Sequence, residues 1–250
     1  ALNLFSLEIR WYSLSYIFGI ILAWVYCKKF LIKEEKILNL FDDLISYLII
    51  GIVLGGRLGY IIFYNLNYYS KNILEIFKIW EGGMSFHGGL LGIILATYIF
   101  SKKNNIKTFI FLDLISLSAP IGIFLGRIAN FINSELYGRQ TDLFWSVKFE
   151  KIDNAYRHPS QIYEAIFEGI ILFILLNFIF KKNFYKSPGL ISALFLIFYS
   201  IFRFIIEFTR EPDAHIGLLV FSLSLGQIIS VIFFIGGTIL FYKKYVSQKQ

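Results

Sequence analysis

Arginine is the residue type whose placement in this sequence points most directly to chemistry. Arg57, Arg127 and Arg203 lie within or at the ends of long apolar segments, whereas the lysine-rich loops between and after such segments contain no arginine. An arginine inside a membrane costs roughly 3 kcal/mol on insertion scales, so it marks a functional site by default. Its planar guanidinium binds phosphate through two parallel hydrogen bonds, which lysine does not reproduce. The pattern predicts a membrane protein that holds a phosphorylated group among its helices.

The third of these arginines belongs to a stripe of charges. Arg203, Glu207 and Arg210 are spaced four and three residues apart, so they share one face of a helix. The stripe is either a self-contained ion-pair ladder or a site in which Glu207 orients one arginine while the other meets a ligand. Both readings can hold together. Two cations for one anion leave the stripe with spare hydrogen-bond donors, which favours ligand binding.

A polar run, 126–138, follows an apolar segment. Arg127, Asn130 and Ser134 share a face if the helix continues that far. Such side chains are costly at a membrane boundary unless they are paired or bind a ligand. A polar helix end that leaves the membrane explains Ser134 and Glu135, but it explains Arg127 poorly. The run is therefore a candidate part of the same site.

His87 is bracketed by two glycine pairs in the segment 82–89, where an apolar helix is expected to begin. A helix N-terminus offers free N–H groups to an anion and favours the neutral imidazole. The neutral form is the one that a general base needs. The alternative is an interfacial histidine that only hydrogen-bonds a neighbour. The sequence does not separate these two interpretations.

Two further features are weaker. In the segment 158–164, Ser160 is placed to cap a helix and Glu164 comes near its first turn. A helix start explains much of this pattern, and His158 is therefore only a weak catalytic candidate. The single cysteine, Cys27, falls at the opposite end of its helix from the arginines, and a packing role is expected for it.

The elements that must position these residues are apolar helices. The chain is 57% hydrophobic and 16% charged, with a mean hydropathy of +0.65, which excludes an ordinary soluble domain. The expected fold class is an all-α integral membrane protein with about seven transmembrane helices, forming a single polytopic domain over residues 1–250. A small extracytoplasmic head, 139–157, lies between the fourth and fifth helices. The expected helices are 12–29, 44–64, 87–101, 109–130, 161–180, 188–208 and 217–242.

Lysine positions predict the orientation in the membrane. The loops after the first, third and fifth helices and the C-terminal tail together hold thirteen lysines. Positive charge stays on the cytoplasmic side. The N-terminus is therefore expected outside and the C-terminus in the cytoplasm, with the loops 65–86 and 131–160 and all the candidate site residues toward the outer side. The net charge of +7 comes mostly from these lysines, so nucleic acid is not an expected partner. No cleavable signal peptide is expected in the first residues.

Glycines recur at spacings typical of helix contacts in lipid. They are Gly51, Gly55 and Gly59 in the second expected helix, Gly88 and Gly92 in the third, and Gly122 and Gly126 in the fourth. Small residues four apart let two helices approach closely. Packing is the expected role for most of them.

The run 126–138 resembles the signature of the prolipoprotein diacylglyceryl transferases, and the resemblance extends along nearly the whole chain. Ser134 stands where a glycine is common and Tyr137 where a tryptophan is common, and the loop 139–157 is short for the family. The other matching blocks, in order, are Arg10–Tyr12, Gly55–Tyr60, Gly82–Gly89, His158–Glu164 and Phe202–Asp213.

The resemblance implies an enzyme of the bacterial cytoplasmic (inner) membrane. It would transfer the diacylglyceryl group of phosphatidylglycerol to the cysteine thiol of a lipobox in the signal peptide of a prolipoprotein, with release of glycerol phosphate. Arg127 and Arg203 suit the phosphate, because arginines aimed at a leaving group stabilise its developing charge. His87 suits a base for the thiol. The residues expected to contact substrate are Tyr12, Arg57, Asn130, Glu135, Gly138, Glu207 and Arg210.

Phosphatidylglycerol, the prolipoprotein and membrane lipids are the expected partners. No cofactor or metal is expected, since three scattered histidines and one cysteine form no site. A lipid or phosphorylated-solute transporter is the main alternative. Transporters often contain inverted repeats and helices broken near mid-membrane. Here the polar residues gather toward one side and no repeat is apparent. A membrane scaffold leaves the arginines unexplained.

Overall fold

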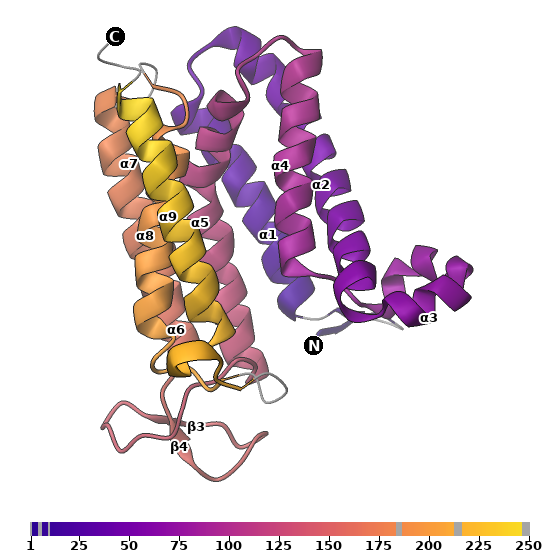
Figure 1. Ribbon diagram of the computed structural model, residues 1–250, viewed down its shortest axis with the longest axis vertical. Helices are drawn as coiled ribbons and strands as arrows, with labels where there is room; N and C mark the ends of the chain where they lie inside the picture. Colours follow the sequence, from indigo (N-terminus) through magenta and orange to yellow (C-terminus); the bar gives the residue numbers. More distant parts are fainter. Residues whose placement is uncertain (1, 5–6, 10, 184–186, 213–216, 247–250) are drawn as a thin grey trace. The chain divides into compact units, whose positions relative to one another are not determined.

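Helices dominate the computed structural model, which describes residues 2–4, 7–9, 11–183, 187–212 and 217–246 (Figure 1). Arg10 and Asp213, two ends of the matching blocks, lie outside the described residues. The helices are α1 (Trp11–Tyr26), α2 (Glu35–Tyr64), α3 (Leu66–Lys71), α4 (Phe86–Lys103), α5 (Thr108–Asn133), α6 (Ser160–Glu164), α7 (Leu172–Asn183), α8 (Leu190–Ile206) and α9 (Leu225–Val246). Two π-helical segments extend them, η1 (Cys27–Leu31) after α1 and η4 (Ala165–Ile171) between α6 and α7.

Short elements complete the described chain. Strands β1 (Leu2–Leu4) and β2 (Leu7–Ile9) pair antiparallel, as do β3 (Val147–Lys148) and β4 (Tyr156–Arg157). Short 3₁₀ turns are η2 (Ile73–Phe77), η3 (Ile79–Glu81) and η6 (Val220–Ser222).

The long helices agree with an all-α membrane protein. Within the described ranges, five helical segments are long and apolar enough to cross a membrane, namely Tyr12–Leu31, Glu35–Tyr64, Thr108–Asn133, Ser160–Lys181 and Leu225–Val246. The apolar helix α8 is shorter, at 17 residues. Each of the seven expected ranges contains a helix. How many of these helices cross the membrane stays a prediction.

Two helix starts differ from the expected ones by about eight or nine residues. Helix α2 begins at Glu35 rather than near 44, because Ile37, Phe41 and Leu44 recur on one buried face and carry the helix through a polar stretch. Helix α9 begins at Leu225 rather than 217. There Ser224 Oγ accepts from the Gln227 amide at 3.2 Å, while Gln227 Oε1 accepts from the Ser224 amide at 3.0 Å. This reciprocal capping box fixes the start of the helix.

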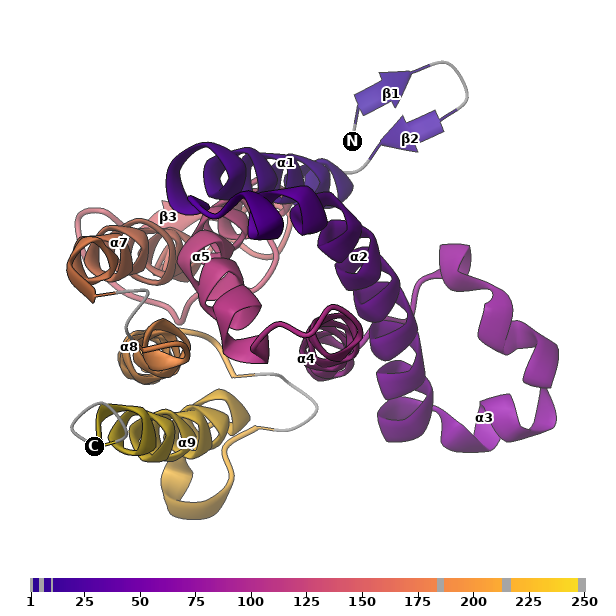
Figure 2. The ribbon, with the colours of Figure 1, turned by 90° about the horizontal axis from the view of Figure 1, so that it is seen from above.

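The chain divides into two compact units, residues 28–112 and residues 1–27 with 113–250. In the first of these, α2 packs along α4 (Figure 2). A Cβ on Gly51 would lie 2.6 Å from Gly92 O, and one on Gly59 would lie 2.7 Å from Gly88 Cα. The two backbones therefore touch, and the expected packing role of these glycines is confirmed. Gly126 in α5 is different, since a Cβ there would meet no described atom within 4 Å.

In the other unit, α8 lies between α7 and α9 (Figure 2). Asp113 of α5 is fully buried and fixes the start of α8. Its carboxylate accepts from the Gly189 amide at 2.6 Å, the Ser192 amide at 2.7 Å and the Ser192 hydroxyl at 2.6 Å. Helix N-termini leave amides without intrahelical partners, and here another helix supplies the acceptor.

Removing the charge of this cap should destabilise the fold. Replacement Asp113→Asn leaves a single carbonyl oxygen for three donors, and we expect the free energy of unfolding to fall by about 1–3 kcal/mol. Denaturant or thermal unfolding in detergent measures it. The exposed ion pair of Lys28 and Asp42 supplies the control, because Asp42→Asn should cost at most about 1 kcal/mol. Equal losses in the two variants would rule out a capping role.

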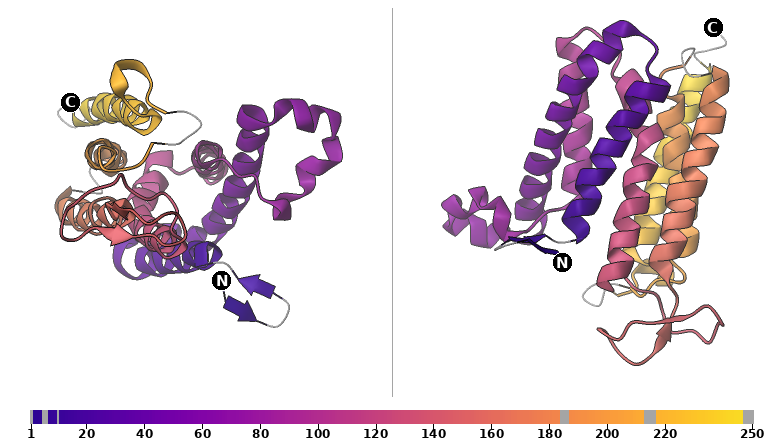
Figure 3. Two further views of the ribbon diagram at one scale, coloured as in Figure 1. Left: turned by 90° about the horizontal axis from the view of Figure 1, so that it is seen from below. Right: turned by 180° about the vertical axis from the view of Figure 1, so that it is seen from behind.

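The expected head, 139–157, is a loop with the short β3–β4 pairing (Figure 3). Phe149 is buried against the rings of Phe131 and Tyr137. Arg157 Nη2 donates to Asp153 Oδ2 at 2.6 Å, and this bond holds the pKa of Asp153 below its usual range. The pair therefore persists at neutral pH and is lost only as the pH falls through that lowered pKa.

Candidate functional site

Two arginines from different helices share one buried carboxylate. Arg127 of α5 places Nη1 3.2 Å from Glu164 Oε2, and Arg203 of α8 bonds the other oxygen, Oε1, of the same side chain. Glu164, the last residue of α6, is fully buried. The two guanidiniums are thus close enough to bind one anion together.

Arg203 has a second carboxylate partner. Its Nη2 lies 2.5 Å from Glu207 Oε2, four residues on, so the predicted ion pair of this stripe is confirmed. The Ser224 hydroxyl donates to Glu207 Oε1 at 3.0 Å and orients the carboxylate. In Arg210, the third member of the stripe, Nη1 lies 3.7 Å from Glu164 Oε1.

A residue that the sequence analysis did not single out completes this group. Glu168, one turn after Glu164, is fully buried, and its Oε2 accepts from Arg127 Nη2 at 3.3 Å. We refer to Arg127, Arg203, Arg210, Glu164, Glu168 and Glu207 as the arginine–glutamate cluster. The sequence does contain a signal for Glu168, because Glu164 and Glu168 lie four residues apart in an apolar segment. Carboxylates are about as costly in a membrane as arginines, so such a pair indicates a functional site.

The cluster changes the expected charge balance. The sequence predicted a stripe with more cations than anions. The fold brings Glu164 and Glu168 to the same place, so the carboxylates offset the guanidinium charges. Because each guanidinium carries five N–H groups, the described contacts of Arg127 and Arg203 do not exhaust their donors.

The end of α5 is a tight turn built on Asn130. Its amide nitrogen donates to Glu135 Oε2 at 3.0 Å, and its carbonyl accepts from the Glu135 amide at 2.9 Å. The helix ends at Asn133, and Ser134 has φ 61°. Ser134 therefore does not continue the face of Arg127, and the condition for their shared face is not met. Left-handed backbone favours glycine, which gives a physical reason for the glycine that is common at this position in the resembling family.

The variant Ser134→Gly should consequently be more stable than the parent. Relief of the left-handed strain is worth about 1 kcal/mol. Thermal unfolding in detergent measures the change. Ser118 lies within α5 and bonds the Leu114 carbonyl, so Ser118→Gly is the matched control and should lose about 1 kcal/mol. A loss of stability in Ser134→Gly would contradict this account.

The first residues of α6 hydrogen-bond the turn that follows α5. Ser160 Oγ donates to Leu136 O at 3.0 Å and Gln161 Nε2 donates to Glu135 O at 2.6 Å. The capping prediction for Ser160 is wrong: Pro159 occupies the N-cap without a side-chain bond, and Ser160 is the first helical residue. Its hydroxyl serves the turn and not its own helix.

Gly138 sits where three chain segments meet. Its amide donates to His158 O at 3.1 Å, and it pairs with Arg210 in an isolated bridge. A Cβ at this position would lie 2.6 Å from His158 Cβ and 2.8 Å from Thr209 O. No larger residue fits, so the glycine is needed to bring the ends of α5, α6 and α8 together.

Arg57 and His87 belong to the unit 28–112. Arg57 is buried, and its guanidinium donates to Glu75 O at 2.6 Å, Ile76 O at 3.0 Å and Gly82 O at 2.6 Å. It thereby fixes the segment that leads to His87.

His87 lies at the second position of α4, as expected for a histidine at a helix N-terminus. It is half-buried, and Ser85 caps the helix by accepting from the Gly88 amide at 3.3 Å. The predicted start of this helix is confirmed. The predicted role of His87 as a base stays a prediction.

The remaining candidates lie outside the described contacts of the cluster. Tyr12 of α1 is exposed, with its hydroxyl 2.9 Å from that of Tyr16. His158 Nδ1 is 3.3 Å from the Tyr163 hydroxyl, within hydrogen-bonding distance, and partial burial lowers the pKa of His158. Cys27 is buried and packs against Leu114 O.

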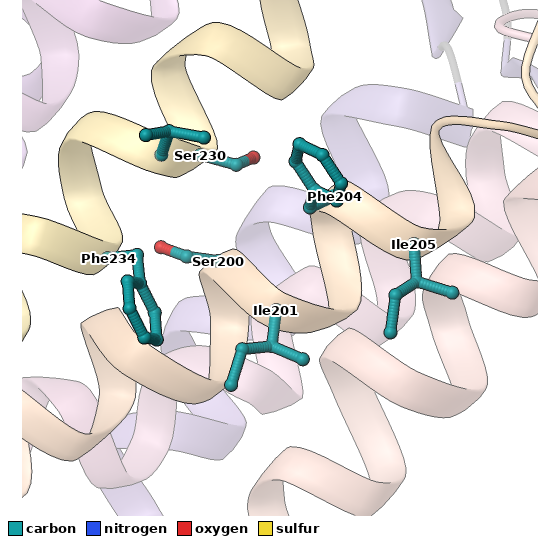
Figure 4. Close-up of a pocket in the computed structure, with 7 residues that line it drawn as sticks. Ser200, Ile201, Phe204, Ile205, Ser230 and Phe234 are labelled. Carbon is teal, nitrogen blue, oxygen red and sulfur yellow. The ribbon is translucent and has the colours of Figure 1, made fainter.

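A cavity of about 240 Å³ lies between α8 and α9. Figure 4 shows its lining, which is mostly apolar and includes the Ser200 and Ser230 side chains. Both hydroxyls donate to carbonyls of their own helices. No candidate site residue lines it.

Similarity to known proteins spans nearly the whole chain. Residues 1–243 match the family model of prolipoprotein diacylglyceryl transferase. The chain is 50% identical over 241 residues to the phosphatidylglycerol–prolipoprotein diacylglyceryl transferase of Rickettsia bellii (strain OSU 85-389), covering 95% of this chain and 91% of the relative. Proteins of the same name from Ehrlichia ruminantium (strain Welgevonden) and Rickettsia typhi are 48% and 51% identical, over 95% and 89% of this chain and 93% and 87% of theirs.

Proposed function

Because this chain belongs to the prolipoprotein diacylglyceryl transferase family, we propose that it transfers the diacylglyceryl group of phosphatidylglycerol to the lipobox cysteine of prolipoproteins. A thioether forms between the cysteine sulfur and a glyceryl carbon. The carbon–oxygen bond to the phosphate breaks, and glycerol phosphate leaves. The proton of the thiol passes to the base and from there to the released glycerol phosphate or to solvent.

The contact of Arg127 and Arg203 with Glu164 carries this proposal. Two guanidiniums that share one carboxylate are spaced to share one phosphate, which offers oxygens in a similar arrangement. As the carbon–oxygen bond breaks, negative charge grows on the phosphate oxygens. Hydrogen-bond donors held in place before the reaction stabilise this charge without reorganising.

The thiol needs a base. A cysteine has a reference pKa near 8.5, so only a few per cent is thiolate at neutral pH. We assign proton removal to His87, which lies half-buried at the capped start of α4.

The other expected substrate contacts are supporting residues in this proposal. Arg57 orders the segment before His87, while Asn130, Glu135 and Gly138 shape the turn beside α6. Glu207 orients Arg203 and Arg210 adds positive charge near Glu164. Tyr12 is assigned to the lipid or peptide because it is exposed.

We further propose seven membrane crossings in the bacterial inner membrane, with the N-terminus outside, the C-terminus in the cytoplasm and the head 139–157 outside. The lysines of the loops and tail support this orientation. It also brings the turn 133–138 to the side on which exported prolipoproteins arrive.

Labelling of single cysteines tests the orientation. In a Cys27→Ser background, a membrane-impermeant thiol reagent applied to intact cells should label a cysteine placed at Asn154 and not one placed at Asn104. Asn154 is in the head and Asn104 follows α4. After permeabilisation both should react, which controls for reactivity. The reverse pattern in intact cells would overturn the proposed sidedness.

The function is tested with purified protein, phosphatidylglycerol vesicles and a peptide that contains a lipobox. We expect the peptide cysteine to gain the mass of one diacylglyceryl group for each glycerol phosphate released. A peptide with alanine for cysteine should gain nothing. Movement of lipid between vesicles without a mass gain would identify a transporter and refute the transferase.

A further inference from the structure

Glu168 is a buried acid to which the proposed reaction gives no role. It is fully buried in the π-helical segment η4, within a stretch long and apolar enough to cross a membrane. Burying a carboxylate there costs several kcal/mol unless partners compensate it. A glutamate that persists in such a place needs a physical reason.

Its contacts single out Arg127. Glu168 Oε2 accepts from Arg127 Nη2 at 3.3 Å, whereas Oε1 is 3.9 Å from Arg203 Nη1 and has no hydrogen bond among the described residues. Arg127 Nη1 meets Glu164 at 3.2 Å. The guanidinium of Arg127 is therefore held at both terminal nitrogens by carboxylates one turn apart.

Close backbone packing produces this contact. A Cβ on Gly169 would lie 2.8 Å from Phe124 Cβ, so η4 approaches α5 with no room for a side chain. Phe124 is three residues before Arg127, and Gly169 directly follows Glu168. The approach thus brings carboxylate and guanidinium together. Segments of π-helix inside α-helices are frequent at functional sites.

Glu164 and Glu168 differ in which arginine hydrogen-bond donors they occupy. Glu164 contacts both arginines, as a phosphate bound between them would, so phosphate and Glu164 compete for the same donors. Among the described residues, Glu168 hydrogen-bonds only Arg127. It can therefore keep its partner when the phosphate takes the place of Glu164.

We propose that Glu168 is a positioning residue for the transfer, which holds Arg127 in the orientation that receives the charge of the leaving phosphate. This rests on the proposed function for its chemistry. Glu168 does not touch the substrate. It acts through Arg127, and removing its charge lets the guanidinium turn away from the phosphate.

The variant Glu168→Gln tests this with almost no change of shape. We expect kcat to fall about tenfold to a hundredfold and the affinity for phosphatidylglycerol to fall about threefold, because orientation matters most when charge develops. Glu168→Asp keeps the charge on a shorter side chain and should recover part of kcat. A kcat of Glu168→Gln within twofold of the parent would overturn the proposal.

A double-mutant cycle shows whether the effect passes through Arg127. In an Arg127→Lys background, Glu168→Gln should change kcat and phosphatidylglycerol binding by less than about twofold. Losses that multiply would mean that Glu168 acts independently of Arg127, and the proposal would fail. Binding of phosphatidylglycerol is measured by native mass spectrometry, which does not depend on transfer. If the parent protein transfers nothing to the peptide, the proposed function is refuted. The binding cycle still tests whether Glu168 acts through Arg127.

Asp113→Asn is the matched control for a structural effect. Asp113 is equally buried in the same unit, and its described bonds go to the start of α8. We expect this variant to lower the unfolding temperature and leave the kcat of the folded fraction unchanged. If Glu168→Gln behaves in the same way, Glu168 is a structural residue and the proposal is wrong.

Discussion

We expect Arg203→Lys to lose about a hundredfold to a thousandfold in kcat/KM, the usual cost of removing one donor to a developing oxyanion. The lysine keeps the positive charge but loses the fork that lets Arg203 reach Glu164 and Glu207 at once. Folding and membrane insertion should survive, because the ammonium still pairs with one carboxylate. Transfer to the lipobox peptide measures the loss, and thermal unfolding shows that the protein is intact.

Arg139 supplies the control for this test. Its Nε donates to the backbone carbonyl of Arg210 at 2.9 Å and contacts no carboxylate of the cluster in the described bonds, so Arg139→Lys should retain activity within a few fold. Arg127→Lys should lose as much as Arg203→Lys or more, since Arg127 meets Glu164 and Glu168. Near-normal turnover by Arg203→Lys would refute the phosphate role.

We expect the second large effect in His87→Gln, with a loss of about a hundredfold to ten-thousandfold at neutral pH if His87 removes the thiol proton. Raising the pH from 7 to 9 increases the thiolate fraction of a free cysteine about twentyfold. The variant should therefore recover part of its rate relative to the parent. Initial rates of peptide modification across this pH range measure the recovery.

Arg203→Lys separates this rescue from a general effect of pH, because its defect lies in the leaving group and should not improve at pH 9. His87→Gln should also still bind phosphatidylglycerol, since the arginine–glutamate cluster is intact. Loss of lipid binding in His87→Gln, or no relative gain at high pH, would show that His87 is structural or contacts the head group. The base would then have to be found elsewhere.

Local patterns predicted the helices well and their ends less well. Apolar runs located α1, α4 and α5 to within a few residues. The start of α2 was missed because its first turns are amphipathic, with Ile37 and Phe41 on the buried face. The predicted start of α9 is too early because the capping box of Ser224 and Gln227 lies inside an apolar run, which by itself indicates continuous helix.

The site was predictable where one helix carries both partners. The ion pair of Arg203 with Glu207 follows from a spacing of four residues. The pairing of Arg127 with Glu164 and Glu168 joins α5 to α6 and η4, and no local spacing encodes it. For the same reason the local pattern predicts Glu164 only as a residue near the helix start and predicts no role for Glu168. Contacts between distant segments depend on packing, which a single sequence shows only indirectly.

The arginine–glutamate cluster also constrains how the protein is assembled during synthesis. Arg127 lies in α5 and leaves the ribosome before its carboxylate partners in α6 and η4 exist. An unpaired arginine in a membrane helix costs up to roughly 3 kcal/mol, and α5 bears this cost until the next helical segment supplies the carboxylates. Helices α5 and α6–η4–α7 should therefore enter the bilayer as a pair, and a chain truncated before Glu164 should be a substrate for membrane quality control.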